Sequence, residues 1–317
     1  MDIDCLCVGI LFADHVCSPL RRLPRPGELM PAEQMQLCLG GCSSNTAMDL
    51  ARLGVKVSVA GCVGEDTFGR FIVDTLDSGG VETSHIRRID TVNSASSMII
   101  NVSGEDRRFI SATGANEEMT VAHIPRRLAT AAKVLYLGGY FMLPGLETTA
   151  TVELFRDARA SGTVTVLDVV YDEGAECWNR LAPLLAETDV FLPNDDEAAL
   201  LTGLKNPLEQ ARRFRQAGAR TVVITLGERG SLLVSDGVAV RAGTYPGRFV
   251  GGTGAGDAFD AGYIAGLIEG EDCEGCLRWG TALGASCVRS IGATESVFNR
   301  REALDLMKEH TLEIKAA

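Results

Sequence analysis

The stretch Gly251-Gly252-Thr253-Gly254-Ala255-Gly256-Asp257 runs directly into the apolar segment AFDAGYIAG at 258–266. This pattern predicts a glycine loop that enters a helix, with one carboxylate at the junction. The first turn of a helix leaves backbone N–H groups without partners, and glycines let an anion approach them closely. Because Asp257 would repel a ground-state anion, we expect it to take a proton from a substrate hydroxyl while the N–H groups hold a transferring phosphoryl group.

Other glycine-loop motifs fit this stretch less well. A dinucleotide-binding turn normally follows the first strand of a βαβ unit, and its acidic residue comes about 20 positions later. A Walker P-loop needs Gly-Lys-Ser/Thr, which does not occur in the sequence. The structural alternative is an ordinary glycine turn in which Asp257 suits the helix dipole, a contribution of about 0.3–1 kcal/mol.

Composition narrows the classes of protein. The 317 residues are 46% hydrophobic and 23% charged, as in a globular protein with a large core. The net charge of −12 argues against nucleic acid or an anionic membrane as a main partner. We see no apolar run long enough to span a bilayer, and Met1-Asp2-Ile3-Asp4 lacks the basic start of a signal peptide.

The cysteine pattern favours a cytoplasmic protein. Ten cysteines are scattered through apolar stretches, as expected of reduced, buried thiols. Cys5 and Cys7 lie at period two on an expected strand, so both thiols should point to one face, and Cys273 and Cys276 open an expected helix. We expect reduced thiols at both pairs and no zinc site.

Apolar strand-like runs alternate with amphipathic helical stretches over most of the chain. The strands are continuous Val/Ile/Leu runs, which is typical of a parallel sheet covered on both faces. We predict an α/β fold with a doubly wound, mostly parallel sheet flanked by helices, whose ligand binds beyond the carboxyl ends of the strands. The expected strands are 4–10, 56–62, 134–137, 163–168, 190–193, 221–225 and 231–235. The expected helices are 44–53, 66–78, 146–160, 195–202, 207–217, 256–269, 273–290 and 300–310.

Two segments interrupt this alternation. Residues 11–39 are rich in loop-forming residues, and residues 91–113 predict a hairpin with strands 96–102 and 107–112. We infer a small β-sheet lid subdomain from 11–39 and 91–113. The α/β domain that binds nucleotide and substrate would then comprise residues 1–10, 40–90 and 114–317.

The hairpin carries two adjacent arginines, Arg107 and Arg108. They are placed to reach an acidic or already phosphorylated substrate. A solvated charged face is the more ordinary explanation for both.

A second informative block is Gly40-Gly41-Cys42-Ser43-Ser44-Asn45-Thr46-Ala47. Paired glycines before a helix let a polyol approach the backbone, and Asn45 can donate to and accept from sugar hydroxyls. The simpler explanation is that Ser43 or Ser44 caps the helix and Asn45 is a turn residue.

Together the two blocks resemble the ribokinase-like (PfkB-type) family of sugar and nucleoside kinases, over essentially the whole chain. The early block is similar to the family's Gly-Gly…Asn-x-Ala pattern, and the late block to its Thr-Gly-Ala-Gly-Asp-Ala-Phe core. Between them, Asn194-Asp195-Asp196-Glu197 matches an Asn-x-x-Glu element, and TLGERG at 225–230 matches a nucleotide-side turn. The resemblance implies a ribokinase-like fold and an ATP-dependent kinase that phosphorylates a hydroxyl group of a sugar or sugar acid.

The resemblance also implies roles for individual residues. Asp257 would be the general base, with an anion hole at Gly254, Ala255 and Gly256. The remaining roles are substrate binding by Asp14, Gly41 and Asn45, nucleotide binding by Asn194, Thr225, Gly227 and Gly230, and water-mediated binding of Mg²⁺ by Glu197. Each has an ordinary alternative, since Asn-x-x-Glu is typical of a helix N-cap and Asp14 suits a solvated loop.

One departure from the family pattern concerns K⁺. The family's late block usually begins with Asp-Thr, where this chain has Gly251 and Gly252. In relatives that bind K⁺ beside the anion hole this aspartate is a ligand, whereas glycine offers only its carbonyl. We therefore doubt strong activation by K⁺.

Assembly and acceptor choice stay open at this point. The β lid of relatives often pairs between subunits, so we expect a homodimer through the lid. A nucleoside kinase would share these motifs, with Phe12 as the early-loop aromatic that could stack on a base. The alternative of another class is a sugar- or nucleotide-binding protein without catalysis, which the intact Asp257 and its glycine loop disfavour.

Overall fold

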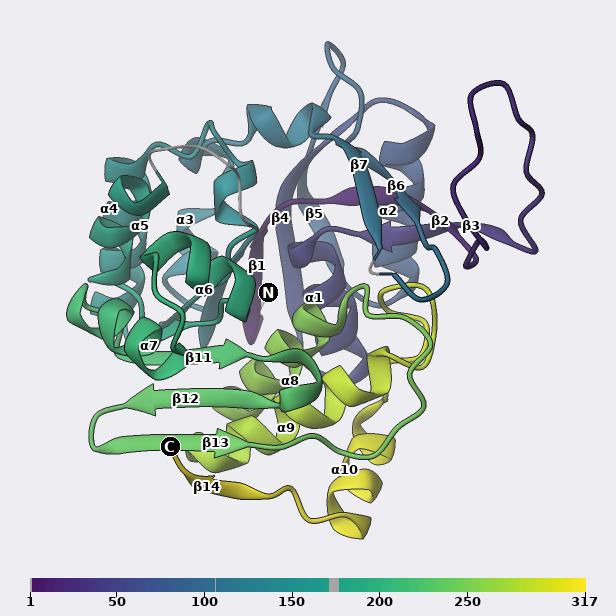
Figure 1. Cartoon of the computed structure of the whole chain (residues 1–317). Coiled ribbons are helices and arrows are strands. Elements are labelled where there is room, and N and C mark those ends of the chain that lie inside the picture. Colours follow the sequence, from purple (N-terminus) through teal and green to yellow (C-terminus); the bar gives the residue numbers. More distant parts are fainter. Residues whose placement is uncertain (1, 106, 171–176) are drawn as a thin grey trace.

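A ten-stranded sheet organises the chain in this computed structural model, which describes residues 2–105, 107–170 and 177–317 (Figure 1). The strand order is β14-β13-β12-β11-β10-β9-β8-β1-β4-β5. The bounds are β1 (Cys5–Gly9), β4 (Val57–Gly64), β5 (Glu82–Ile89), β8 (Val134–Gly138), β9 (Val164–Leu167), β10 (Val190–Phe191), β11 (Thr221–Thr225), β12 (Ser231–Ser235), β13 (Val238–Ala242) and β14 (Ile314–Ala316). Neighbours from β11 to β5 pair in parallel, and β12, β13 and β14 add an antiparallel edge. The predicted doubly wound, mostly parallel sheet is confirmed.

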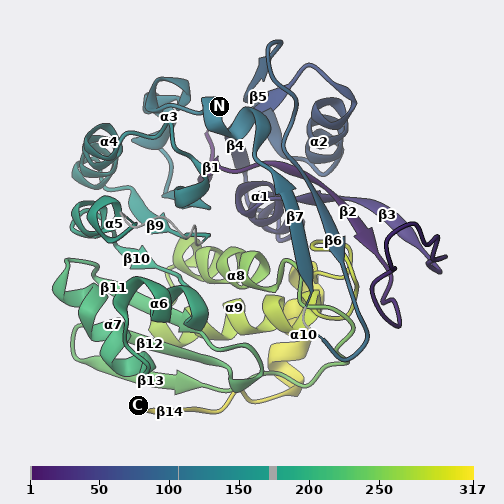
Figure 2. The same ribbon diagram turned by 45° about the horizontal axis from the view of Figure 1, so that its top comes forward.

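Helices cover both faces of this sheet, and each face has its own apolar core (Figure 2). Every residue of β1, β4 and β8 is buried, because successive side chains enter opposite cores. One core includes side chains of α1 (Cys42–Arg52), α2 (Thr67–Ser78), α8 (Ala255–Glu269), α9 (Cys273–Cys287) and α10 (Arg300–Glu309). The other includes side chains of α3 (Arg126–Ala129), α4 (Thr148–Ala160), α5 (Cys177–Leu185), α6 (Asp195–Thr202) and α7 (Pro207–Gln216). Cys5 and Cys7 share the first core, with sulfur atoms 3.8 Å apart, as predicted.

The edges of the main sheet differ from the sequence-based expectation. Strands β5, β13 and β14 were not predicted. β5 and β14 are edge strands whose polar residues hide the strand pattern, and β13, which pairs with β12 and β14, is only partly buried over most of its five residues. The short α3 and the Pro183-containing α5 were also missed. Among the described helices, none is long and apolar enough to cross a membrane.

A separate four-stranded sheet lies beside the main one, in the order β3-β2-β6-β7. Its strands are β2 (Phe12–Cys17), β3 (Met35–Gly40), β6 (Ser96–Ile100) and β7 (Arg108–Ala112). The predicted hairpin is confirmed as β6 and β7, and the loop-rich segment contains β2 and most of β3.

The register of this small sheet sorts its side chains onto two faces. Asp14 on β2 pairs with Ser97 on β6, and Ser97 pairs in turn with Ser111 on β7. The next row brings Met98 opposite Ile110. Because successive residues of a strand point to opposite faces, the first row faces inward and the second faces solvent. We call the inward row, Asp14, Ser97 and Ser111, the inner row.

Candidate active site

A cavity of about 680 Å³ lies between the small sheet and the carboxyl ends of the parallel strands. Ile10 follows β1, Asp168 follows β9 and Asn194 follows β10, and all three line the cavity with the inner row of the small sheet. This is where the topology of a doubly wound sheet predicts a ligand.

The cavity brings together most of the residues singled out from the sequence. Its lining includes Asp14, Gly41, Asn45, Asn194, Glu197, Thr225, Gly254, Gly256 and Asp257. The described lining does not include Ala255, Gly227 or Gly230. Gly227 and Gly230 form the turn after β11, both with positive φ, and a Cβ on Gly230 would lie 1.9 Å from the carbonyl oxygen of Ala242. Close packing therefore requires glycine at position 230 whether or not a nucleotide binds there.

Helix α8 places Asp257 in its first turn. Gly254 caps the helix with φ 78°, and a Cβ there would lie 2.5 Å from the Cβ of Ala293, so both conformation and space demand glycine. The first intrahelical donor is the N–H of Ala258 to Gly254, while the N–H of Ala255 donates to Gly252 at 3.3 Å. The N–H groups of Gly256 and Asp257 therefore precede the helical ladder and are available to an anion.

The Asp257 carboxylate is fixed by the early glycine block. Nδ2 of Asn45 donates to Oδ2 of Asp257 at 2.8 Å, across 212 positions of sequence, and the Thr46 hydroxyl donates to the Asp257 carbonyl at 3.3 Å. Burial raises the pKa of Asp257, while hydrogen bonds with Asn45 and Cys42 and the charge of Arg107 lower it; burial outweighs them. A raised pKa makes this carboxylate a stronger base for an incoming alcohol.

Asp14 lies on the inner row of the small sheet and is 7% exposed. Burial raises its pKa to about 7, against a hydrogen bond with Ser97, with a further upward contribution from the charge of Asp257. Its Oδ1 has no hydrogen-bond partner among the described residues, and the Ser97 and Ser111 hydroxyls lie 2.9 Å apart beside it. The inner row thus offers acceptors and donors suited to a polyol.

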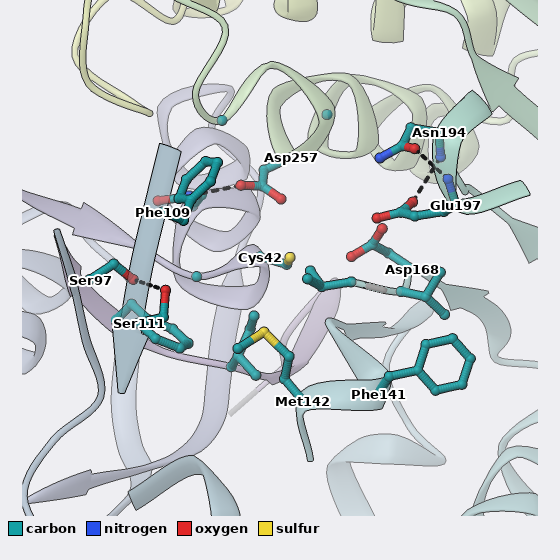
Figure 3. A pocket seen from close by; sticks show the side chains of 18 of the residues that line it. Cys42, Ser97, Phe109, Ser111, Phe141, Met142, Asp168, Asn194, Glu197 and Asp257 are labelled. Atoms are coloured by element: carbon teal, nitrogen blue, oxygen red, sulfur yellow. Dashed lines mark hydrogen bonds between the residues drawn. The ribbon is translucent and has the colours of Figure 1, made fainter. Parts of the chain in front are cut away.

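Asn194 and Glu197 form a reciprocal capping box at the start of α6. Asn194 Oδ1 accepts from the Glu197 N–H, and Glu197 Oε2 accepts from the Asn194 N–H, both at 2.9 Å. The ordinary structural explanation for this motif therefore holds. Both side chains nevertheless line the cavity, where Glu197 lies near Asp168 (Figure 3).

Three buried groups of the site were missed from the sequence: Cys42, Asp168 and Asp260. Cys42 lies between Asp257 and Asp168 (Figure 3). Burial raises the pKa of both Asp168 and Asp260. The charges of Glu197 and Asp257 raise the pKa of Asp168 further, and the charges of Asp168 and Asp257 raise that of Asp260. The Tyr136 hydroxyl donates to Asp260 at 3.0 Å, and the Gly139 N–H to Asp168 at 3.1 Å. Asp168 could have been found, because it is a charge that ends an expected parallel strand.

The two arginines of the hairpin separate. Arg108 points to solvent and forms an ion pair with Glu105. Arg107 lines the cavity, with its guanidinium 5.5 Å from the centre of the Phe109 ring. A Cβ on Gly252 would lie 2.8 Å from Nη1 of Arg107, so this cation lies directly against the glycine loop.

Known proteins resemble this chain along its whole length. The family described as pfkB family carbohydrate kinase matches residues 2–300. A ribokinase of Haemophilus influenzae is 28% identical over 313 residues, 95% of this chain and 97% of that protein. A 5-dehydro-2-deoxygluconokinase of Clostridium perfringens is 29% identical over 82% of this chain and 80% of that protein. The solved structure of Arabidopsis thaliana ribokinase complexed with ribose and ATP has a TM-score of 0.82 at 26% identity, covering 97% of this chain and 99% of that chain.

These similarities fix the class and then the family. The fold is the ribokinase-like α/β fold, a large mostly parallel sheet with a small separate sheet beside it. Because the family match spans nearly the whole chain, the protein belongs to the pfkB family of carbohydrate kinases. It is a phosphotransferase that acts on an alcohol group, and the resemblance found in the sequence is confirmed.

Proposed function

We propose that the protein transfers the γ-phosphoryl group of ATP to a hydroxyl group of a sugar or sugar acid. The observation that carries the proposal is the 2.8 Å hydrogen bond between Asn45 and Asp257, which joins the two glycine blocks at one cavity. The names of the relatives, a ribokinase and a 5-dehydro-2-deoxygluconokinase, support this acceptor class.

In this mechanism Asp14, Gly41 and Asn45 hold the acceptor, and Asp257 takes the proton of the hydroxyl that attacks. We place the anion hole at Gly254, Ala255 and Gly256, where the N–H of Gly256 at the start of α8 is available to stabilise the charge of the transferred group. The N–H of Ala255 would join it only by giving up its 3.3 Å hydrogen bond to Gly252. The small sheet acts as a lid that excludes water and so limits ATP hydrolysis. Residues 11–39 and 91–113 supply it.

The other end of the cavity suits a nucleotide and Mg²⁺. Bound ATP supplies the phosphoryl group, and Mg²⁺ screens its negative charge. Asn194 and Thr225 line this end, and Gly227 and Gly230 lie in the turn that follows Thr225. A Cβ added at Gly227 would meet no atom within 4 Å, so this glycine has open space beside it. Glu197 offers carboxylate oxygens, which Mg²⁺ prefers as ligands. The ion would keep several of its bound waters, and Glu197 would hold it through them.

Replacement of the base tests the proposal. Asp257→Asn keeps the side chain's size and removes the basic oxygen, so we expect kcat to fall at least about a hundredfold while acceptor affinity stays nearly constant. The readout is ADP formation with a panel of sugars and sugar acids, with acceptor binding measured by calorimetry. Asp305→Asn, on the exposed surface of α10, is the matched control. Near-normal turnover of Asp257→Asn would refute the assignment.

A nucleoside kinase is a second candidate, because Phe12 and Phe109 both line the cavity and either ring offers a base a stacking surface. Including nucleosides in the acceptor panel separates the two candidates. Binding of every ligand without turnover would instead favour a protein that only binds sugar or nucleotide.

We also propose that K⁺ does not strongly activate the enzyme. A Cβ on Gly251 would lie 2.9 Å from the Ser290 carbonyl oxygen, and the Arg107 guanidinium occupies the space beside Gly252. The loop therefore lacks a carboxylate ligand and already has a cation next to it. A severalfold rise in rate when K⁺ replaces a large organic cation at constant ionic strength would contradict this.

We propose a cytoplasmic homodimer that assembles through the lid. The outward face of the small sheet exposes Met35, Leu37, Met98 and Ile110, an unusual run of large apolar side chains. Strands β3 and β7 are also edge strands with unpaired backbone groups. A second copy of this sheet would cover both features.

A further inference from the structure

Three different elements bring metal-ligating atoms together at the centre of the cavity. Cys42 opens α1, Asp168 follows β9, and Asp257 lies in the first turn of α8. The Cys42 sulfur and one carboxylate oxygen from each aspartate all lie within 4.8 Å of one another. Figure 3 shows the sulfur between the two carboxylates.

We propose that Cys42, Asp168 and Asp257 bind a thiophilic divalent cation such as Zn²⁺ or Cd²⁺. Zn²⁺ is held tetrahedrally by thiolate sulfur at about 2.3 Å and carboxylate oxygen at about 2.0–2.2 Å. Ligand atoms of such a site lie about 3.5 Å apart, so side-chain rotations that close the present spacing by roughly 1 Å complete it. Three protein ligands leave one position open to the cavity.

A second group points to a ligand at the same place. Asn45 is 3% exposed, and its amide is anchored on Asp257 through Nδ2. Its Oδ1 is buried and has no hydrogen-bond partner among the described residues. Asn45 lines the cavity and contacts one of the three proposed ligands, so its unsatisfied oxygen can accept a hydrogen bond from a water bound in the open position.

The donor set separates this cation from Mg²⁺. Mg²⁺ requires near-octahedral oxygen ligands and keeps several waters, so a thiol at the centre of the site does not attract it. A thiolate instead selects soft or borderline ions. We therefore assign the soft-cation site to Cys42 and its two carboxylates, apart from the oxygen ligand proposed for Mg²⁺ at Glu197.

Binding of the cation should release a proton and inhibit the kinase. The metal–sulfur bond forms as the thiol proton leaves to solvent, so each bound ion releases at least one proton. With its carboxylate on the metal, Asp257 is no longer available as a base, and the kinase is inhibited. Only this inhibition rests on the proposed function.

Titration of the full-length, chelator-treated chain with Cd²⁺ tests the site. The readout is the ultraviolet charge-transfer absorption of a Cd–thiolate bond, together with the affinity from calorimetry. We expect one Cd²⁺ per chain at this site and at least a tenfold weaker affinity in Cys42→Ser, since even loss of an outer partner of a metal ligand costs about 10–100-fold. Cys273→Ser, at the partly exposed start of α9, is the matched control and keeps the wild-type affinity.

Three outcomes decide the matter. Equal Cd²⁺ affinity of wild type and Cys42→Ser, with both folded by circular dichroism, overturns the site. Selective loss in Cys42→Ser, with weakened binding in Asp257→Asn, supports it. Cd²⁺ that binds through Cys42 but leaves turnover with excess Mg²⁺ and ATP unchanged supports the site and contradicts the role of Asp257 as base.

Discussion

At the scale of single residues, the site is dominated by buried carboxyl groups whose pKa lies above the usual value. Burial raises the pKa of Asp14, Asp168, Asp257 and Asp260, and each lies near at least one of the others. Like charges in a dry site cannot all ionise together. Acceptor binding and proton removal should therefore both depend on pH.

Asp14 gives the clearest pH prediction. Its pKa is raised to about 7, and the ionised form accepts hydrogen bonds at both oxygens, whereas the protonated form uses one oxygen as a donor. We expect acceptor affinity, measured by calorimetry without ATP, to rise as the pH increases from about 6 to 8. Asp14→Asn should bind more weakly and lose this dependence, while Asp305→Asn keeps it. A flat profile in the wild type would remove Asp14 from the binding role.

The same shift has a consequence for folding. A carboxyl group whose pKa is raised in the folded state stabilises the fold fully below its unfolded pKa near 4, and this contribution is lost as the pH rises through about 7. In urea unfolding at pH 8, Asp14→Asn should therefore be more stable than wild type, on the order of 2–4 kcal/mol. The difference should vanish near pH 4.

Sequence reasoning found the residues that carry family motifs and missed those that only the fold assembles. Asp257, Asn45 and Asp14 could be placed because their neighbours form recognisable local patterns. Ser97 and Ser111 could not, because their meeting with Asp14 depends on the register between β2, β6 and β7. A single sequence does not specify register between strands so far apart in the chain.

At the scale of elements, two glycines at the start of α8 differ in how much space surrounds them. Gly254→Ala introduces a Cβ at positive φ, 2.5 Å from Ala293, and we expect a loss of at least about 1–2 kcal/mol in free energy of unfolding. Gly256→Ala meets no atom within 4 Å and should be neutral or stabilising by up to about 1 kcal/mol.

For Gly256→Ala we expect the opposite of its effect on stability, namely a clear loss of activity. The methyl group of Gly256→Ala projects where a phosphoryl group must approach the backbone, so kcat should fall roughly ten- to a hundredfold in a fully folded protein. Thermal melts and ADP release measure the two effects. A fully active Gly256→Ala enzyme would place the anion hole elsewhere.

The sequence predicted those strands of the main sheet that helices cover on both faces. β1, β4, β8 and β9 are covered on both faces, so their apolar runs stand out in the sequence. β5 carries Arg87 and Arg88 on an edge strand, and β14 is three residues long, so neither produces a period that a window can detect.

At the scale of the whole molecule, the outward face of the small sheet should decide assembly. Ile110→Lys places a charge on the edge strand β7, at the end of the outward row that contains Met98 and Leu37, and we expect it to convert a dimer to monomers in sedimentation experiments. Leu304→Lys, on α10 and similarly exposed, is the matched control that should leave the dimer intact. A wild-type chain that sediments as a monomer would argue against a lid-mediated dimer.

The alternation of residues in β6 and β7 places the side chains that line the cavity and those of the exposed outer face at different positions of the same strands. Odd-numbered Ser97 and Ser111 line the cavity, and even-numbered Met98 and Ile110 lie on the exposed face proposed for association. Point substitutions can therefore retune acceptor choice without disturbing association, and the reverse. Inserting or deleting one residue inside either strand would move its side chains to the opposite faces. We therefore expect related proteins to differ in these strands by substitutions and not by insertions or deletions.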